Sequence, residues 1–163
     1  MNNLISIIVG SESDLEYAKS CSKILKDFSV AHSIKVLSAH RTPSLLGEHI
    51  SRSEEEGTQI FIAMAGLAAH LAGSVASKTT KPVIGVPVDG GPLKGFDALL
   101  STVQMPKGIP VGTVAIGSAG AANAAYLSLQ ILGLSSEKIA KQLKSIREDQ
   151  LKLVEQINNK IKT

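Results

Sequence analysis

The sequence contains very few of the residues that typify secreted, metal-binding or base-stacking proteins. Its 163 residues include one cysteine, Cys21, and no tryptophan, and aromatic residues make up only 3%. A single cysteine forms no internal disulfide, and no Cys/His cluster has the spacing of a zinc site. Proteins that bind single-stranded nucleic acid stack bases on aromatic side chains, so that class is disfavoured.

Most of the chain also lacks a surplus of one charge. The formal net charge is +3, yet residues 1–134 hold ten Lys or Arg and ten Asp or Glu, a net of zero. The other seven bases and four acids (7 − 4 = +3) lie in residues 135–163. Alternating charges along one amphipathic segment are typical of a solvated helix face, so we expect no nucleic-acid partner.

Long hydrophobic runs are missing as well. The first run, 4–9, has strand length, well below the ~20 residues of a membrane-spanning helix, and it lacks the cationic flank of a signal sequence. We therefore expect no membrane partner and a cytoplasmic protein in which Cys21 stays reduced. With 44% hydrophobic and 19% charged residues, a chain of this length predicts a single globular domain, 1–163.

Short apolar runs alternate with helix-length segments along the chain. The runs that predict strands are 4–9, 30–37, 59–65, 82–87 and 112–116. Helices are predicted over 13–28, from Pro43, and over 68–78, 96–103 and 118–132. Apolar, partly β-branched strands separated by helices are typical of a parallel sheet covered on both faces. The pattern predicts an α/β fold with a doubly wound sheet.

The last segment is different. Behind a cap at Ser135 or Ser136, one helix of roughly thirty residues is predicted, about 40 Å long. Its apolar residues recur at steps of three, four or seven. We therefore expect an α/β body over 1–134 followed by this helix over 135–163. Its apolar stripe either contacts another subunit or folds back on its own domain.

Ligands of open parallel sheets bind beyond the carboxyl ends of the strands. After the first run, the hydroxyls of Ser11 and Ser13 and a helix N-terminus favour a phosphate, and Asp14 suits ribose hydroxyls. The segment has neither a GxGxxG nor a GxxxxGK[ST] motif, so NAD and ATP are not indicated. A plain helix cap at Ser13 and Asp14 is the alternative interpretation.

Histidines follow the next two runs. After the second come Ser38, His40 and Arg41, which combine a group for proton transfer with a fork for phosphate. After the third, the small residues of 65–73 allow a flat ligand to approach the backbone. His70 is placed one turn into the helix that follows, and a satisfied helix histidine is its alternative interpretation.

The residue types around these two histidines indicate which kind of reaction they could catalyse. Two histidines at neighbouring strand ends, without companion carboxylates or cysteines, favour proton transfer over metal binding. A Ser/His/Asp hydrolase would need a GxSxG elbow, which the sequence lacks. His32 and His49 lie away from these ends and are predicted to be structural.

Together these motifs resemble a known family. They occur in the same order over roughly residues 4–132 and read Gly10-Ser-x-Ser-Asp14, Ser38-Ala-His-Arg-Thr-Pro43, Ala65-Gly-x-Ala-Ala-His-Leu71, Pro82-Val-Ile-Gly-Val-Pro-Val88, and 97–106 through 119–125. They resemble the PurE family, the bacterial N5-carboxyaminoimidazole ribonucleotide mutases of de novo purine (IMP) biosynthesis.

The resemblance implies a three-layer α/β/α sandwich with a flavodoxin-like parallel sheet. It implies a homo-octamer with active sites between subunits, and no metal or organic cofactor. The implied reaction is an isomerisation: the carboxylate leaves the exocyclic nitrogen and rejoins the ring at C4, which yields 4-carboxy-5-aminoimidazole ribonucleotide.

The resemblance also implies residue roles. Ser11 and Arg41 would bind the phosphate, Asp14 would bind the ribose hydroxyls, and His40 would be the general acid/base. The predicted catalytic residues are then His40 and His70, and the predicted substrate-binding residues are Ser11, Ser13, Asp14, Ser38, Arg41, Ala65, Gly66, Ala68, Ala69 and Leu71.

Two positions depart from the family pattern: Leu67 stands where Gly is common, and Ala72 stands where Pro is usual. They are expected to change the shape of the loop. A related branch carboxylates aminoimidazole ribonucleotide directly with carbon dioxide and typically has Lys after the histidine, so Arg41 favours the mutase (class I) branch. A non-catalytic module for phosphoribosyl ligands is the alternative, and a structural assembly protein would leave His40 unexplained.

Overall fold

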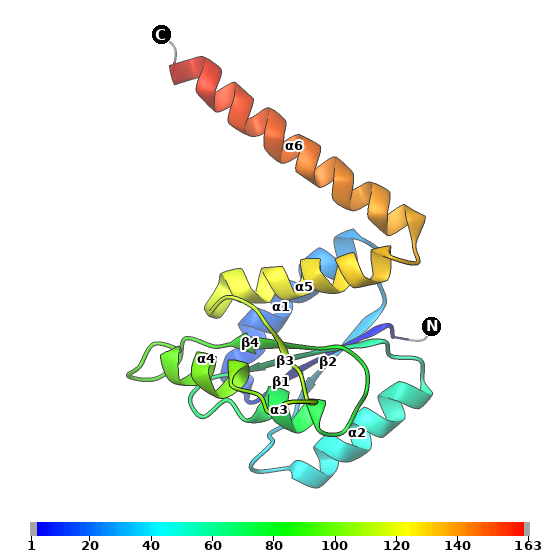
Figure 1. Ribbon diagram of the computed structural model, residues 1–163, viewed down its shortest axis with the longest axis vertical. Helices are drawn as coiled ribbons and strands as arrows, with labels where there is room; N and C mark the ends of the chain where they lie inside the picture. Colours follow the sequence, from blue (N-terminus) through cyan, green and yellow to red (C-terminus); the bar gives the residue numbers. More distant parts are fainter. Residues whose placement is uncertain (1–2, 162–163) are drawn as a thin grey trace. The chain divides into compact units, whose positions relative to one another are not determined.

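The computed structural model describes residues 3–161 (Figure 1). The strands are β1 (Ile5–Val9), β2 (His32–Val36), β3 (Ile60–Ala65), β4 (Val83–Pro87) and β5 (Gly112–Thr113). The helices are η1 (Glu12–Asp14), α1 (Leu15–Asp27), α2 (Pro43–Glu55), α3 (Leu71–Ala76), α4 (Phe96–Val103), α5 (Gly117–Gly133) and α6 (Glu137–Ile161). The chain divides after Ser128 into two compact units, which are described one at a time.

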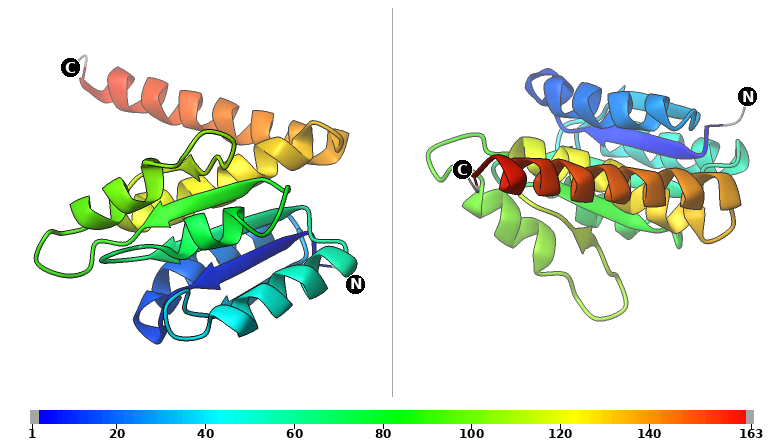
Figure 2. Two further views of the ribbon diagram at one scale, coloured as in Figure 1. Left: turned by 60° about the horizontal axis from the view of Figure 1, so that its bottom comes forward. Right: turned by 90° about the horizontal axis from the view of Figure 1, so that it is seen from above.

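The first unit is built on one parallel sheet with the strand order β2-β1-β3-β4-β5. In its centre, Ile7 on β1 pairs with Ile34 on one side and Ile62 on the other. The order reverses between β1 and β3, which is the flavodoxin-like arrangement. Helix α1 and the first part of α5 cover one face, and α2, α3 and α4 cover the other (Figures 1 and 2). The predicted three-layer α/β fold is confirmed.

The core explains why the strand sequences are continuously apolar. Strands β1 and β4 are buried along their whole length, and β3 is buried up to its last residue. Ile8, Phe61 and Val83 face α2 and α3, whose Leu46 and Val75 complete one apolar cluster. Neighbouring residues of these strands point to the opposite face, so both faces need apolar side chains.

The histidines away from the strand ends hold the fold together, as predicted. His49 Nε2 on α2 lies 2.8 Å from the hydroxyl of Ser6, which is fully buried on β1. Burial, together with the charge of Lys35, lowers the pKa of His49, which favours the neutral ring in the folded protein. His32 Nε2 lies 2.7 Å from Ser22 Oγ, which joins β2 to α1.

Two predicted elements differ from the observed ones. The strand expected over 112–116 covers only Gly112–Thr113. The helix expected from Ala68 begins at Leu71, because Leu67 and Ala69 have φ angles of 57° and 32°, in the left-handed region that a right-handed helix excludes. His70 therefore precedes α3, and its predicted place one turn inside a helix was wrong.

The second unit, residues 129–163, contains the end of α5 and the helix α6. Ser136 Oγ accepts a hydrogen bond of 3.5 Å from the backbone N–H of Ile139, which fits one of the two predicted caps. Residues 162–163 of the predicted helix lie outside the described part. Within residues 3–161, no helix is both long and apolar enough to cross a membrane. The single-domain organisation with a boundary after residue 134 stays a prediction.

Candidate active site

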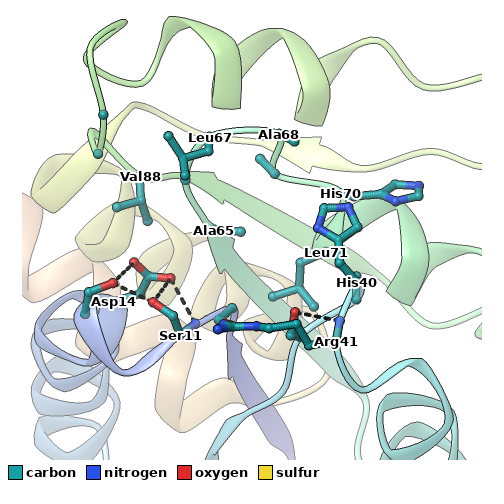
Figure 3. A pocket seen from close by; sticks show the side chains of 18 residues that line it. Ser11, Asp14, His40, Arg41, Ala65, Leu67, Ala68, His70, Leu71 and Val88 are labelled. Carbon is teal, nitrogen blue, oxygen red and sulfur yellow. Dashed lines mark hydrogen bonds between the residues drawn. The ribbon is translucent and has the colours of Figure 1, made fainter.

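A cavity of about 560 Å³ lies beyond the carboxyl ends of β1 to β4 (Figure 3). Every residue that the sequence assigned to catalysis or binding lines it. The complete lining is Gly10, Ser11, Ser13, Asp14, Ser38, Ala39, His40, Arg41, Ala65, Gly66, Leu67, Ala68, Ala69, His70, Leu71, Val88, Gly90 and Gly91. The parallel sheet thus brings residues from four separate segments to one place.

The segment after β1 is folded around the carboxylate of Asp14. Its Oδ2 accepts the backbone N–H of Ser11 at 3.2 Å, and its Oδ1 accepts the hydroxyl of Ser13 at 3.2 Å. The hydroxyls of Ser11 and Ser13 lie 2.5 Å apart. The carboxylate therefore closes the turn at η1 in a capping box with Ser11, whereas it makes no side-chain cap bond to α1, and it also lines the cavity.

Arg41 joins the loop after β2 to the loop after β1. Its guanidinium Nη2 donates a hydrogen bond of 3.1 Å to the carbonyl oxygen of Gly10. Ser38 stabilises this loop, since its Oγ accepts a hydrogen bond of 3.1 Å from the backbone N–H of Arg41. Within residues 3–161 the guanidinium has no carboxylate partner, so its charge is available to an anion in the cavity.

The two predicted catalytic histidines lie beside each other. The ring centroids of His40 and His70 are 5.4 Å apart and their planes are tilted by 34°. Figure 3 shows both rings on one side of the cavity, away from Ser11 and Asp14. Neither ring has a hydrogen-bond partner among the described residues, and both side chains are exposed. His70 is therefore not a satisfied helix histidine.

The loop between β3 and α3 forms the apolar wall. Leu71 is 2% exposed and anchors the loop in the core, whereas Leu67 is 55% exposed at the cavity. The positive φ angles of Leu67 and Ala69 cost about 1–2 kcal/mol each for residues with a Cβ. Such strain concentrates at functional sites. The other departure from the family pattern, Ala72, is buried in the core cluster.

Sequence reasoning missed one wall of the site. Val88, Gly90 and Gly91 line the cavity from the loop after β4. This loop follows the fourth predicted strand at the same sheet edge, so the rule that pointed to the other three ends would have found it. The loop also touches the apolar wall, because a Cβ on Gly91 would lie 2.5 Å from Leu67 Cδ2.

Comparisons with known proteins found similar sequences and structures. The family model described as AIR carboxylase matches residues 4–152. The N5-carboxyaminoimidazole ribonucleotide mutase of Methanocaldococcus jannaschii is 54% identical over 159 residues, which covers 98% of each chain. The protein of the same name from Vibrio parahaemolyticus is 51% identical over 150 residues, 92% of this chain and 93% of its own. The crystal structure of Treponema denticola PurE matches with a TM-score of 0.89 at 28% identity over 98% of both chains.

Proposed function

The chain belongs to the AIR carboxylase family, and we propose that its cavity converts N5-carboxyaminoimidazole ribonucleotide into 4-carboxy-5-aminoimidazole ribonucleotide. The chain is thus an isomerase of the mutase type that acts in purine biosynthesis. The observation that carries the proposal is the division of one cavity between a polar segment, 10–14 with Arg41, and the paired rings of His40 and His70.

Substrate binding is assigned to the polar side of the cavity, residues 10–14 with Arg41. The guanidinium of Arg41 and the hydroxyls of Ser11 and Ser13 bind the phosphate, and the carboxylate of Asp14 accepts the ribose hydroxyls. Ser38 positions Arg41 through the backbone hydrogen bond of 3.1 Å. Charge-assisted hydrogen bonds of this kind are among the stronger ones in proteins, so they supply much of the affinity.

The chemical step is assigned to the other side of the cavity, which holds His40, His70 and the apolar wall. The bond between the exocyclic nitrogen and the carboxylate breaks, and its electron pair returns to the aminoimidazole. The released carbon dioxide stays beside the small and apolar residues of the wall, Ala65, Gly66, Ala68, Ala69 and Leu71. A water-poor wall limits its escape.

The ring carbon C4 then attacks the carbon dioxide, and the proton on C4 has to leave. His40 accepts this proton, and a proton is delivered to the exocyclic nitrogen, which becomes the amine. In sum, one carboxylate moves from nitrogen to carbon and one proton moves the other way, so the reaction needs no net acid or base. Imidazole suits this shuttle because it both accepts and donates protons near neutral pH. His70 stands next to His40 as the second exposed ring of the site.

The assembly proposed here is a homo-octamer with active sites between subunits, in the cytoplasm. Exposed apolar side chains support an oligomer: Phe96, Leu100 and Val103 follow each other at helical spacing on α4 and are 65%, 57% and 49% exposed. On α6, Val154 and Ile157 are 54% and 48% exposed. Apolar side chains that recur along one helix face are typical of subunit contacts. Native mass spectrometry of the whole chain tests the stoichiometry, and a monomer would contradict it.

A direct assay tests the reaction and the branch together. Purified protein is incubated with N5-carboxyaminoimidazole ribonucleotide, without ATP or bicarbonate, and the C4-carboxylated product is measured. Product formation is expected for the class I mutase branch. Product that forms only from aminoimidazole ribonucleotide with added carbon dioxide would indicate the carboxylase branch, and binding without product would indicate a non-catalytic module.

A further inference from the structure

A hydrogen bond joins α1 to the cavity wall that follows β4. The hydroxyl of Tyr17 donates it to Oδ1 of Asp89. Tyr17 lies three residues after Asp14, about one helical turn along the same segment. Asp89 lies between Val88 and Gly90, which both line the cavity. The bond therefore links the segment proposed to hold the ribose with a wall of the same cavity.

At Val88 the wall is anchored by a backbone hydrogen bond from its N–H to the carbonyl of Ala65, but the loop that follows has few hydrogen bonds to the rest of the fold. Within residues 3–161, the bond from Tyr17 is the only side-chain hydrogen bond between the 89–95 loop and another element of the fold. The loop's own backbone bonds are local, such as that from the N–H of Lys94 to the carbonyl of Gly91. Segments with few tertiary bonds open at low free energy, so the loop's position depends strongly on Asp89.

Asp89 is held in a defined place. A Cβ on Gly117, the first residue of α5, would lie 3.2 Å from the carboxylate oxygen Oδ1 of Asp89. A Cβ on Gly95 would lie 3.1 Å from the Cα of Asp89. The carboxylate thus fills the corner between the loop and the N-terminal end of α5, where the helix dipole favours a negative charge.

The surroundings of Tyr17 keep its hydroxyl protonated, so that it can donate a hydrogen bond. The hydrogen bond to Asp89, followed by burial and by the charges of Asp89 and Asp14, raises the pKa of Tyr17 to about 12. Its hydroxyl therefore stays protonated near neutral pH and can donate to Asp89.

We propose that Tyr17 and Asp89 are positioning residues that hold the 88–91 wall against the nucleotide and thereby set the affinity for it. They take no part in proton or carboxylate transfer. The identity of the nucleotide rests on the proposed function, whereas the link between α1 and the loop does not.

Substitutions at both ends of the bond test the proposal. Tyr17→Phe removes the hydroxyl and keeps the ring. KM for the ribonucleotide is expected to rise roughly five- to tenfold, which is the effect of losing one hydrogen bond, and kcat should be nearly unchanged. Asp89→Ala should have the same effect, and the double variant should be no worse than either single one. Asp89→Asn keeps an acceptor oxygen and should restore most of the affinity. Tyr126→Phe changes the chain's other tyrosine and is the matched control.

Amide hydrogen exchange of the ligand-free protein reports on the loop without any turnover. Amides of the 89–95 loop should exchange several times faster in Tyr17→Phe and in Asp89→Ala, and at the normal rate in Tyr126→Phe. Faster exchange with an unchanged KM would overturn the positioning role, as would a loss of kcat at constant KM. If the unmodified protein turns nothing over, the proposed function fails, and unchanged exchange in both variants would separately overturn the inference.

Discussion

The two sides of the cavity are built in contrasting ways. On the side proposed to bind the phosphate, the polar groups already bond to one another: Asp14 accepts hydrogen bonds from Ser11 and Ser13, and Arg41 donates to the carbonyl of Gly10. On the other side the exposed rings of the histidine pair have no hydrogen-bond partner within residues 3–161, beside a strained loop of small residues. Preorganised groups suit binding, and unpartnered rings suit proton transfer. The contrast predicts that substitutions on the two sides change different kinetic constants.

The largest effect is expected from His40→Asn. The variant should lose about three orders of magnitude in kcat, because it removes the group proposed to take the proton from C4. Affinity for the product nucleotide should change less than about threefold, since the phosphate side is untouched. Steady-state kinetics and calorimetric titration of the product measure the two quantities. His70→Asn is the companion variant: if it abolished turnover while His40→Asn kept the wild-type rate, the assigned roles would be reversed.

A large effect of the opposite kind is expected from Arg41→Ala. Loss of the proposed charge-assisted contact with the phosphate should raise KM by about ten- to a hundredfold, and kcat should fall much less. Arg41→Lys keeps the charge but loses the planar fork, so its KM should lie between the KM of the unmodified protein and that of Arg41→Ala. Arg52→Ala, on the exposed part of α2, is the control. A kcat effect without a KM effect would show that the two sides do not divide binding and chemistry.

A moderate effect is expected where the apolar wall meets the 88–91 wall. Gly91 has a φ of 77°, and a Cβ there would lie 2.5 Å from Leu67 Cδ2, so Gly91→Ala should reduce the free energy of unfolding by about 1–2 kcal/mol. Gly90→Ala is the matched control, because a Cβ there meets nothing within 4 Å. Combining Gly91→Ala with Leu67→Gly should restore part of the loss in thermal melts at equal protein concentration. Equal effects of the Gly90 and Gly91 substitutions would exclude a contact between the walls.

The smallest effect concerns a histidine outside the cavity. Burial lowers the pKa of His49 in the folded protein, so the unfolded chain binds more protons as the pH falls through about 6.5. His49 should therefore destabilise the fold below this pH and contribute no pH dependence above it. The measurement is the pH slope of the unfolding free energy between about pH 5 and 7, which His49→Gln should flatten. An unchanged slope would mean that His49 is not the group responsible.

Local sequence patterns were enough to predict most of the architecture. All five strands lie within the predicted apolar runs, although β5 covers only the first two residues of its run. Helix α4 spans the predicted residues 96–103, and Pro43 begins α2. The rule that ligands bind at the carboxyl ends of parallel strands led to three of the four segments that line the cavity. The loop before α3 could not be predicted, because its sequence of small residues is compatible with a helix and only the folded chain imposes positive φ on Leu67 and Ala69.

The sequence by itself determined the α/β class, the order of the elements and the kinds of side chain that meet at the sheet edge, because periodicity and strand ends are properties of neighbouring residues. Only the tertiary structure decided which side chains touch. The rings of His40 and His70 come within 5.4 Å of each other from different loops, and Tyr17 bonds to Asp89 across 72 positions of the chain. Such contacts arise when helices and loops pack on the sheet, and no local pattern encodes them.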